Sequence, residues 1–396
     1  MDTSYLLDWA NLLLRWAHVI TAIAWIGSSF YFVWLDDSLE RRPARNDLPD
    51  NVDGELWSVH GGGFYQARKF LTPPAHIPGP LHWFYWESYS TWLTGFGLLT
   101  VLYLLNATSF LVDKSVADWT PAQAVGMALG YLVAGWVVYD LICKLFGEMK
   151  HGDAIVGALV ALYVVAASWL AAHWFAGRAA FVLTGAMLAT IMSANVAHVI
   201  IPGQRKSVAA LQAGQKPDPK FGKRGKQRSV HNTFFTLPVL FAMLSNHYSM
   251  VWAHPLNWLV LDVLMAAGAL IRIYFVKRHT AQPGAWRWAA AGCALIAGVI
   301  VWLAPAPRAQ VVAELPPPTF AEVTKIVGER CVLCHNPQLA SKGVMLNTRD
   351  NLLAHAQQVY QMAVVQKLMP MNNATGITDE ERALLGRWYL AGAKGD

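Results

Sequence analysis

Long apolar segments recur through most of this chain, and they limit its fold more than any other feature. A run of about twenty apolar residues is long enough to cross a hydrocarbon core roughly 30 Å thick. The composition agrees, with 55% hydrophobic and only 14% charged residues. We therefore predict an all-α, polytopic bundle of eight transmembrane helices. The expected spans are Asn11–Leu35, Trp83–Leu105, Pro121–Phe146, Ala154–Phe175, Ala179–Ile201, Ser229–Tyr248, Leu256–Val276 and Trp288–Ala304.

The pentapeptide from Cys331 to His335 is the second informative feature. C-x-x-C-H is the attachment signature of a c-type haem, in which both thiols add to the vinyl groups and the His presents a ring nitrogen to the iron. A zinc site is the alternative, but zinc would need a second Cys/His pair. The other cysteines, Cys143 and Cys293, lie in apolar stretches. We therefore expect one covalent haem c, held by Cys331, Cys334 and His335 on the oxidising, non-cytoplasmic side of a bacterial-type membrane.

Residues 320–396 form a predicted small domain around that haem. From about Phe320 the chain is polar and short, near the lower size limit for an independent domain. A covalently held haem would supply the missing core. The Pro-rich stretch 305–319 is a predicted spacer between this domain and a membrane domain, residues 1–304.

A sixth iron ligand is expected from one of two methionines, Met369 and Met371, because Met is the usual soft partner of His. Further along, Thr378 and Glu381 have the spacing of a capping box that starts a final helix. With these features in this order, the domain resembles the class I cytochrome c family. In that family the Met before a Pro is the axial ligand. The resemblance implies that Met369 binds the iron opposite His335, with Met371 in reserve.

The distribution of basic residues predicts the topology. The haem motif places the C-terminus outside, and eight spans then place the N-terminus outside as well. Lys and Arg should therefore gather in the first, third, fifth and seventh loops. Those loops hold Arg41, Arg42, Arg45, Arg68, Lys69, Lys144, Lys150, Arg205, Lys206, Lys216, Lys220, Lys223, Arg224, Lys226, Arg228, Lys277, Arg278 and Arg287, whereas the even loops hold only Lys114 and Arg178. We predict a multi-pass protein of the bacterial inner (cytoplasmic) membrane, with both termini and the cytochrome domain in the periplasm.

Two other interpretations of charge and hydropathy are excluded. The pI near 9.1 and the basic run 204–228 could indicate nucleic-acid binding. Topology and anionic lipid headgroups of the bilayer explain that run, so no nucleic-acid partner is expected. The first apolar segment is predicted to be a retained span and not a cleaved signal peptide, because residues 1–14 contain no Lys or Arg and no small-x-small site follows.

Ionisable and polar residues within the spans are costly and indicate functional positions. The predicted topology sorts them into two groups. Glu87, Asp140, Lys144, Asn195, His198, His231, Asn232 and Arg272 lie toward the cytoplasmic side, and Arg15, His18 and His247 lie nearer the middle or outer half. A residue near a span end, such as Lys144 or His231, is more often snorkelling or interfacial than catalytic. Glu87, His18 and Arg272 have apolar sequence on both sides and are the stronger candidates.

The first span contains a second hint of haem. The segments Arg15–Ile20, Ala24–Gly27 and Phe30–Phe32 resemble the first span of a family of small membrane oxidases and copper-resistance-type proteins. In the protoporphyrinogen-oxidase members the corresponding His is a b-type haem ligand, which implies the same role for His18. By residue type, its partner ligand would be His198, His231 or His247. The plainer alternative is a buried His hydrogen-bonded to a neighbouring helix.

The whole chain resembles one family, the membrane-bound urate oxidases (urate hydroxylases) with eight spans and a C-terminal cytochrome c. Besides the first span, the resemblance rests on Glu55–Tyr65, Leu81–Glu87, Thr91–Phe96, Asn195–Ile200 and the Met369-Pro370 dipeptide. It implies oxidation of urate to 5-hydroxyisourate. The electrons would leave through the haem to an acceptor of the respiratory chain, a cytochrome c or a terminal oxidase, without producing hydrogen peroxide.

Residue types on the cytoplasmic side suit a planar urate anion. Arg272 could bind the anion and Glu87 or His198 could act as the base, so these three are the predicted catalytic residues. Asn195 and Asn232 could bind the ring edges, and Trp83 or Trp86 could stack on the ring. Electrons would then cross most of the membrane, which calls for a relay such as a haem b at His18. Without a second haem, the substrate pocket would move to the outer half, near Arg15 and His247.

Two rival functions fit the same features. One is a membrane cytochrome that relays electrons from quinol to a soluble acceptor without an organic substrate. The other is a small-molecule transporter with a redox regulatory domain. Transporters usually show Gly- or Pro-broken spans in paired halves, and that pattern is not seen in this sequence.

Overall fold

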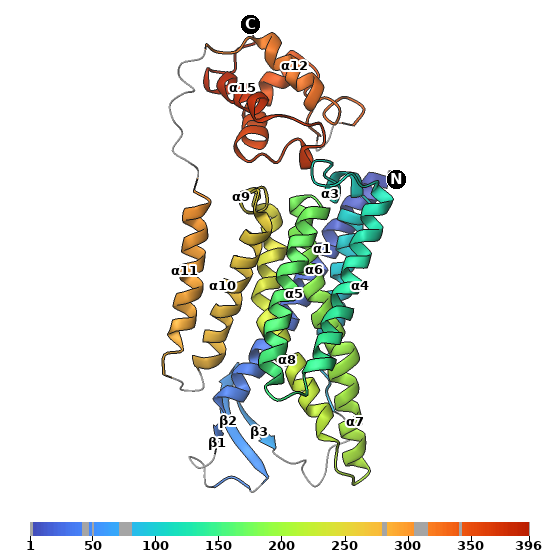
Figure 1. Ribbon diagram of the computed structural model, residues 1–396, viewed down its shortest axis with the longest axis vertical. Helices are drawn as coiled ribbons and strands as arrows, with labels where there is room; N and C mark the ends of the chain where they lie inside the picture. The colour runs from blue at the N-terminus through green and yellow to red at the C-terminus, as the bar shows by residue number, and fades with distance from the viewer. Residues whose placement is uncertain are drawn as a thin grey trace.

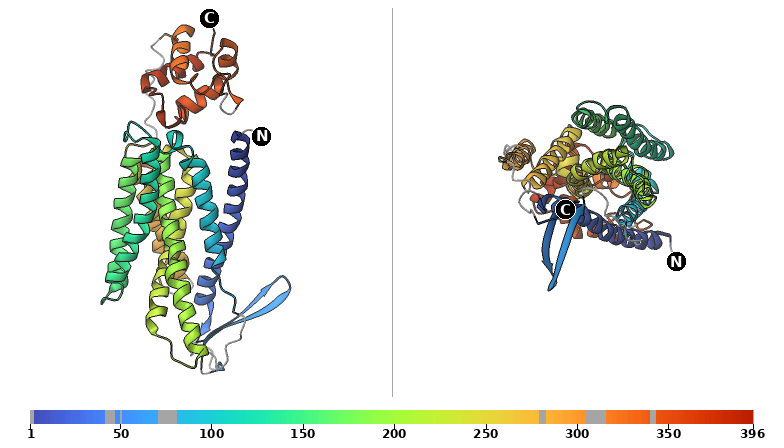
Figure 2. Two further views of the ribbon diagram at one scale, coloured as in Figure 1. Left: turned by 90° about the vertical axis from the view of Figure 1, so that its right-hand side faces the viewer. Right: turned by 90° about the horizontal axis from the view of Figure 1, so that it is seen from below.

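The computed structural model describes residues 3–41, 47–49, 51–70, 81–278, 283–304, 316–339 and 343–395. Long helices run side by side along one axis, with a small helical domain at one end and a β-hairpin at the other (Figure 1). The N-terminus lies at the end that carries the C-terminal domain (Figure 2). This arrangement agrees with the prediction that both termini lie on one side of the bundle.

The long helices account for most of the chain up to residue 304. They are α1 (Thr3–Ser38), α2 (Trp86–Leu99) with the π-helical η1 (Thr100–Leu104), α4 (Pro121–Phe146), α5 (Gly152–Trp174), α6 (Gly177–Ala194) with the π-helical η2 (Asn195–Ile200) and α7 (Ile201–Gln212), α8 (Pro219–Leu244), α10 (Asn257–Lys277) and α11 (Trp286–Trp302). Short helices lie at the end of the bundle nearest the C-terminal domain: α3 (Ala107–Phe110), η3 (Ser245–His247) and α9 (Ser249–Trp252).

Within the described residues, five helices are long and apolar enough to cross a membrane when judged by length and composition. They are Tyr5–Ser38, Pro121–Phe146, Gly152–Trp174, Gly177–Gln212 and Asn257–Lys277. This set identifies a multi-pass membrane protein. Because the set holds five helices, the prediction of eight spans is not reproduced by this criterion.

The other three predicted spans differ from a long apolar helix for separate reasons. The segment Trp83–Leu105 is divided between the 14-residue α2 and the π turn η1. The segment Ser229–Tyr248 is mostly the second half of α8, whose first half carries the basic residues of the preceding loop. The last segment forms α11, which has only 17 residues.

Helix α6 forms the centre of the bundle. In its most apolar window 78% of the residues are buried, compared with at most 33% in the other four spans. It packs against α4, α5 and α8. A Cβ on Gly185 would lie 2.7 Å from Cβ of Ala242 in α8, so the small residue permits a close approach of these two helices. Side chains of α6 are therefore packed on several sides.

The first polar loop contains a β-sheet, so the all-α prediction is wrong there. The strands are β1 (Glu40–Arg41), β2 (Val52–His60) and β3 (Gly63–Phe70), antiparallel in the order β1-β2-β3. His60 pairs with Gly63 across a two-residue turn in which Gly61 and Gly62 have φ of 56° and 79°. A Gly-Gly pair suits such a turn because both positions need positive φ. The hairpin projects away from the helices (Figure 2).

The C-terminal domain has its own hydrophobic core and consists of short helices. They are α12 (Phe320–Arg330), α13 (Arg349–Ala354), α14 (Ala356–Val359), η7 (Tyr360–Val365), η8 (Met371–Asn373) and α15 (Asp379–Leu390). The predicted capping box is confirmed, because the Thr378 side chain accepts from the Glu381 N–H and Glu381 accepts from the Thr378 N–H. The first and last helices are joined by an ion pair of 2.9 Å between Arg330 and Glu381. This hydrogen-bonded ion pair holds the pKa of the Glu381 carboxyl below its usual range.

Candidate functional site

A polar network occupies the core where α4, η2 and α8 meet. The Asn195 amide donates to the Tyr139 hydroxyl and to the Asn232 carbonyl oxygen, each at 3.0 Å. The Tyr139 hydroxyl lies 2.7 Å from Nδ1 of His231, and the Asn232 amide donates to the Met192 carbonyl at 3.0 Å. The two asparagines predicted to bind ring edges are therefore brought together, but they already bind one another.

A buried ion pair borders this network. Arg228 of α8 lies 2.7 Å from Asp140 Oδ1, and the two side chains are only 4% and 8% exposed. Lys144 reaches the other carboxylate oxygen, Oδ2, at 2.7 Å from a largely exposed position. One carboxylate therefore holds two cations, and the Arg228 guanidinium also lies over the Tyr139 ring at 4.9 Å. This pair fixes α8 against α4 at the end of the bundle that carries the hairpin.

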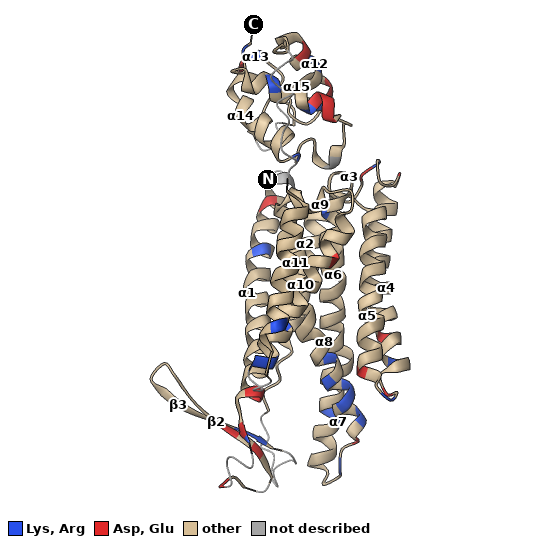
Figure 3. Cartoon of the chain, turned by 60° about the vertical axis from the view of Figure 1, so that its left-hand side comes forward, with Lys and Arg blue, Asp and Glu red and all other residues tan. Residues whose placement is uncertain are grey.

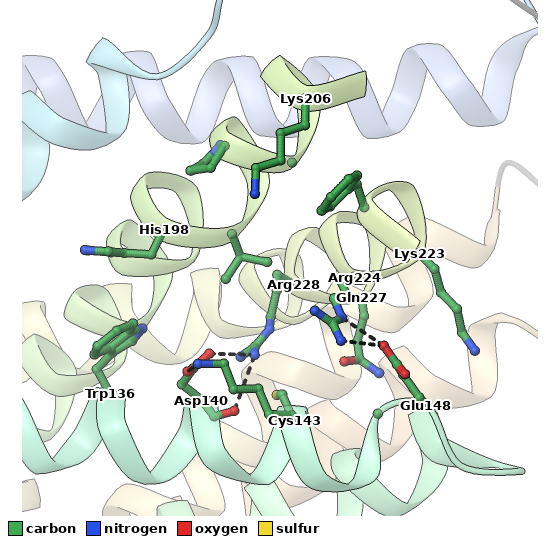
Figure 4. Close-up of a pocket in the computed structure, with 16 residues that line it drawn as sticks. Trp136, Asp140, Cys143, Glu148, His198, Lys206, Lys223, Arg224, Gln227 and Arg228 are labelled. Atoms are coloured by element: carbon green, nitrogen blue, oxygen red, sulfur yellow. Dashed lines mark hydrogen bonds and ion pairs between the residues drawn. The ribbon is translucent and has the colours of Figure 1, made fainter. Parts of the chain in front are cut away.

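A cavity of about 370 Å³ opens beside the ion pair, between α4, η2, α7 and α8 (Figure 4). His198 and Trp136 lie at one end of it, with ring centroids 5.0 Å apart, and Glu148 and Lys223 lie at the other. Its charged lining is mostly basic: Lys144, Lys206, Lys223, Arg224 and Arg228 against Asp140 and Glu148. Such a lining suits an anion with an aromatic or flat face.

The position of His198 follows from Pro202. Proline has no N–H, so the carbonyl four residues earlier, at His198, cannot make the usual helical bond. The helix widens just before this point, and the Ile201 N–H bonds to the Val196 carbonyl, five residues back. Such π segments are frequent at functional sites. Here the π turn carries Asn195 into the buried network and leaves His198 exposed at the cavity.

The structure does not bring the three predicted catalytic residues together. His198 lines the cavity, whereas Arg272 of α10 is buried with its guanidinium 3.7 Å from the centroid of the Phe30 ring of α1. Glu87 begins α2, and its Oε2 is buried without a hydrogen-bond partner among the described residues. Within the described residues no hydrogen bond or ion pair joins these three side chains. Their catalytic role stays a prediction.

The predicted stacking residues lie near the start of α2, with different neighbours. The guanidinium of Arg205 lies 5.9 Å from the Trp83 ring and 5.7 Å from the Tyr85 ring. Trp86 is 63% exposed. Only Trp83 therefore lies beside a cation that an anionic ring could also contact.

His18 packs against α2. Its Nδ1 lies 3.1 Å from the Thr91 carbonyl and 3.2 Å from the Thr94 hydroxyl. A Cβ at position 95 would lie only 2.8 Å from His18 Cε1. Because Gly95 has no side chain, the His18 ring can pack against α2. Donation from Nδ1 to a carbonyl leaves Nε2 free, as in many metal-binding histidines. The same contacts also fit the plainer alternative of a His hydrogen-bonded to a neighbouring helix.

The three histidines considered as partners of His18 have other surroundings. His231 bonds to Tyr139, and His198 lies 3.2 Å from the Ala194 carbonyl. His247 lies in η3, near the C-terminal domain. Among the described residues no group of three or more His, Cys, Asp or Glu side chains could hold a metal ion. Neither the second haem nor its partner ligand is thus identified by these contacts.

The C-x-x-C-H segment follows α12 directly. Cys331 is the C-cap of that helix, and both Cys331 and Cys334 are free thiols. Nδ1 of His335 lies 3.0 Å from the Val344 carbonyl. Donation to this carbonyl fixes the ring and leaves Nε2 free, which is the usual arrangement of an iron-binding His. These residues fit a covalent haem.

The Met369 loop is held by backbone bonds. The N–H groups of Leu368 and Met369 both donate to the Met362 carbonyl, at 2.8 and 3.0 Å. Arg382 of α15 donates to the Met369 carbonyl at 2.7 Å and to the Ala363 carbonyl. This arginine ties the loop to the last helix and positions Met369.

The long apolar helices define the chain as a multi-pass helical membrane protein, and a charged cavity lies within its helical bundle. The family model described as urate oxidase N-terminal matches residues 4–304, so the chain belongs to that family. This match confirms the resemblance for residues 4–304 and indicates an oxidoreductase with a function related to urate oxidation. No curated protein and no solved structure matches the chain in the other comparisons.

Sequence reasoning missed several residues of these sites. The basic-loop pattern predicts Arg228 only as a loop cation, yet it is buried in the ion pair. Tyr139 was not singled out, although it lies one residue before Asp140 and bonds to Asn195. A pattern that could have found Arg228 was present, because it starts the apolar half of α8.

Proposed function

We propose that this protein oxidises urate to 5-hydroxyisourate and passes the electrons through a haem c to an acceptor of the respiratory chain, without releasing hydrogen peroxide. The haem would be held by Cys331, Cys334, His335 and Met369. The family match over residues 4–304 supports the substrate. The hydrogen bond from His335 Nδ1 to the Val344 carbonyl is the single observation that best supports the electron-transfer role of the C-terminal domain.

The reaction balances with water as the second substrate and an electron acceptor in place of oxygen. The urate monoanion and one water give neutral 5-hydroxyisourate, one proton and two electrons. A bound haem c would accept the electrons singly and pass them on. The protein residues must therefore bind the anion, orient the water and take up its proton.

We further propose that all eight predicted segments cross the inner membrane, with both termini in the periplasm. The hairpin end of the bundle carries most of the Lys and Arg residues, notably on α7 and the first half of α8 (Figure 3). The C-terminal domain lies at the opposite end. This asymmetry supports an inner position for the hairpin.

The test uses purified membranes or detergent-solubilised protein without oxygen. Urate should reduce the ferric haem, seen as the sharp absorption bands of a ferrous c-type haem, and hydrogen peroxide should not form in air. A quinol relay without organic substrate is the alternative function. If quinol reduces the haem and urate does not, the relay describes the protein and the urate proposal is wrong.

Replacing the predicted axial ligand should change the haem potential. Met369→Ala should lower the midpoint potential and remove the weak sulfur-to-iron absorption at the red end of the spectrum, since a Met ligand raises the potential relative to stronger donors. Redox titration and absorption spectra measure both effects. Met371→Ala is the matched control, and if only the control shows these changes, Met371 is the ligand.

A relay through His18 has its own test. If urate is oxidised at the cytoplasmic residues Glu87, His198 and Arg272, a haem b near His18 is needed to carry electrons outward. A pyridine-haemochrome assay should then show b-type as well as c-type haem, and His18→Ala should lose only the b component. One c-type haem per chain and no other would eliminate the relay and, with it, the cytoplasmic site.

A further inference from the structure

A second cavity, of about 190 Å³, lies at the junction between the membrane domain and the C-terminal domain. Membrane-domain residues line one side, and residues around the predicted iron ligand line the other. The lining consists of Arg178, Asn246, His247, Trp252, Met362, Leu368, Met369 and Met371. The junction is also held by a hydrogen bond of 2.6 Å from the Ser249 hydroxyl to the Gln366 carbonyl. Any ligand in this cavity would lie beside Met369.

Two residues of this lining carry N–H groups that need an acceptor. Nε of Arg178 and Nε1 of Trp252 are buried and have no hydrogen-bond partner among the described residues. A buried donor without a partner costs free energy, so such groups normally bind a ligand or an ordered water. Both groups belong to residues that line this cavity, so a ligand with two acceptor atoms would satisfy them once the side chains turn toward it.

The described lining of the cavity is cationic, because Arg178 carries a permanent positive charge and none of the described lining residues is an Asp or Glu. Arg178 makes no ion pair with the carboxylates of the described residues, and its guanidinium lies 5.5 Å from the centroid of the Phe110 ring. A cation here runs against the positive-inside rule, which disfavours Lys and Arg in outer loops. Binding of an anion at this position would account for the exception.

The junction cavity lies far from the cavity lined by His198 and Trp136. Arg178 and His198 lie twenty residues apart on the continuous helix Gly177–Gln212, which corresponds to about 30 Å. An electron leaving the cytoplasmic cavity would have to cover that distance to reach the Met369 loop. An electron leaving the junction cavity would start beside it.

We propose that the junction cavity is the urate-binding site, an inference that rests on the proposed function. Arg178 and Trp252 would donate to the urate carbonyl oxygens and the anionic ring edge. His247 would take the proton released when water adds to the oxidised ring. The two electrons would leave singly through the haem held at Met369, and no relay across the membrane is needed.

The experiment compares Arg178→Gln, Trp252→Phe and a control, Lys114→Gln, in the full haem-loaded chain. Lys114 is an outer-side cation that is 79% exposed and paired with Asp118, outside the cavity. Haem staining and the absorption spectrum first establish that each variant is folded and loaded. Two quantities are then measured: the urate concentration that half-saturates anaerobic haem reduction, and the midpoint potential of the haem.

The proposal predicts that Arg178→Gln raises the half-saturating urate concentration roughly ten- to hundred-fold, because a charge-assisted hydrogen bond is lost. Trp252→Phe should raise it several-fold, and Lys114→Gln should leave it unchanged. If Arg178→Gln shifts only the midpoint potential, its anion is a haem propionate and the proposal is wrong. Unchanged values for both quantities overturn it as well.

Equilibrium dialysis of urate against dithionite-reduced protein separates failure of the site from failure of the function, because it measures binding without turnover. If the parent chain binds urate but urate never reduces its haem, the proposed function fails. The site is then judged by whether Arg178→Gln weakens this binding. If the parent chain binds no urate, both proposals are wrong.

Discussion

Cys331→Ala protein should run on a denaturing gel without the haem stain of the parent chain. Covalent attachment requires both thiols of the motif, with His335 beside the iron. The substitution removes one thiol at the C-cap of α12, where the chain enters the motif. A noncovalent haem is lost on denaturation, so the stain reports the covalent bond itself. The expected effect is complete loss of signal.

Cys293→Ala is the matched control, because Cys293 is an exposed free thiol of α11 outside the motif. It should keep the full stain. Undiminished staining of Cys331→Ala would remove the basis for a c-type haem in this chain.

Asp140→Ala should destabilise the membrane domain by about 3–5 kcal/mol, the usual cost of removing one partner of a buried ion pair. The reason is that Arg228, only 4% exposed, would keep a buried charge without its carboxylate. Thermal unfolding in detergent, followed by tryptophan fluorescence, measures the loss as a lower Tm. The double change Asp140→Leu with Arg228→Met should recover much of the stability, since no buried charge remains.

Lys144→Ala is the control for that series. It removes the second cation of the same carboxylate, but from a side chain that is 65% exposed. Exposed ion pairs contribute about 0–1 kcal/mol, so the change in Tm should be small. Equal losses for Asp140→Ala and Lys144→Ala would mean that burial of Arg228 is not the source of the effect.

Apolar runs predicted the bounds of a helix well where one uninterrupted helix covers the run. The predicted segment Pro121–Phe146 has the same bounds as α4, and Thr378 is the N-cap of α15 as the capping box indicated. The hairpin was missed although its turn is visible in the sequence, because Gly61-Gly62 was considered only within a loop between spans. Local patterns of this kind could have been found.

The sites depend on contacts that a single sequence does not contain. Arg228 and Arg178 were both counted as loop cations, and only packing shows that one is buried against Asp140 and the other faces the Met369 loop. Glu87, His198 and Arg272 were grouped by their expected depth along three different helices. Their side chains do not meet in the structure. Depth follows from position along a span, whereas the direction of a side chain depends on which helices are neighbours.

The hydrogen bond between Ser249 and Gln366 has a kinetic consequence for the proposed function. With the proposed substrate site and haem in one polypeptide and in contact, electron transfer between them would be a first-order process. A diffusing cytochrome would depend on a bimolecular encounter, with a rate constant of about 10⁵–10⁷ M⁻¹s⁻¹ without steering and, where charges steer it, a strong dependence on ionic strength. The internal step of this chain should therefore have the same rate at any dilution and at low or high salt. Only the later delivery of electrons to the respiratory chain should vary with either.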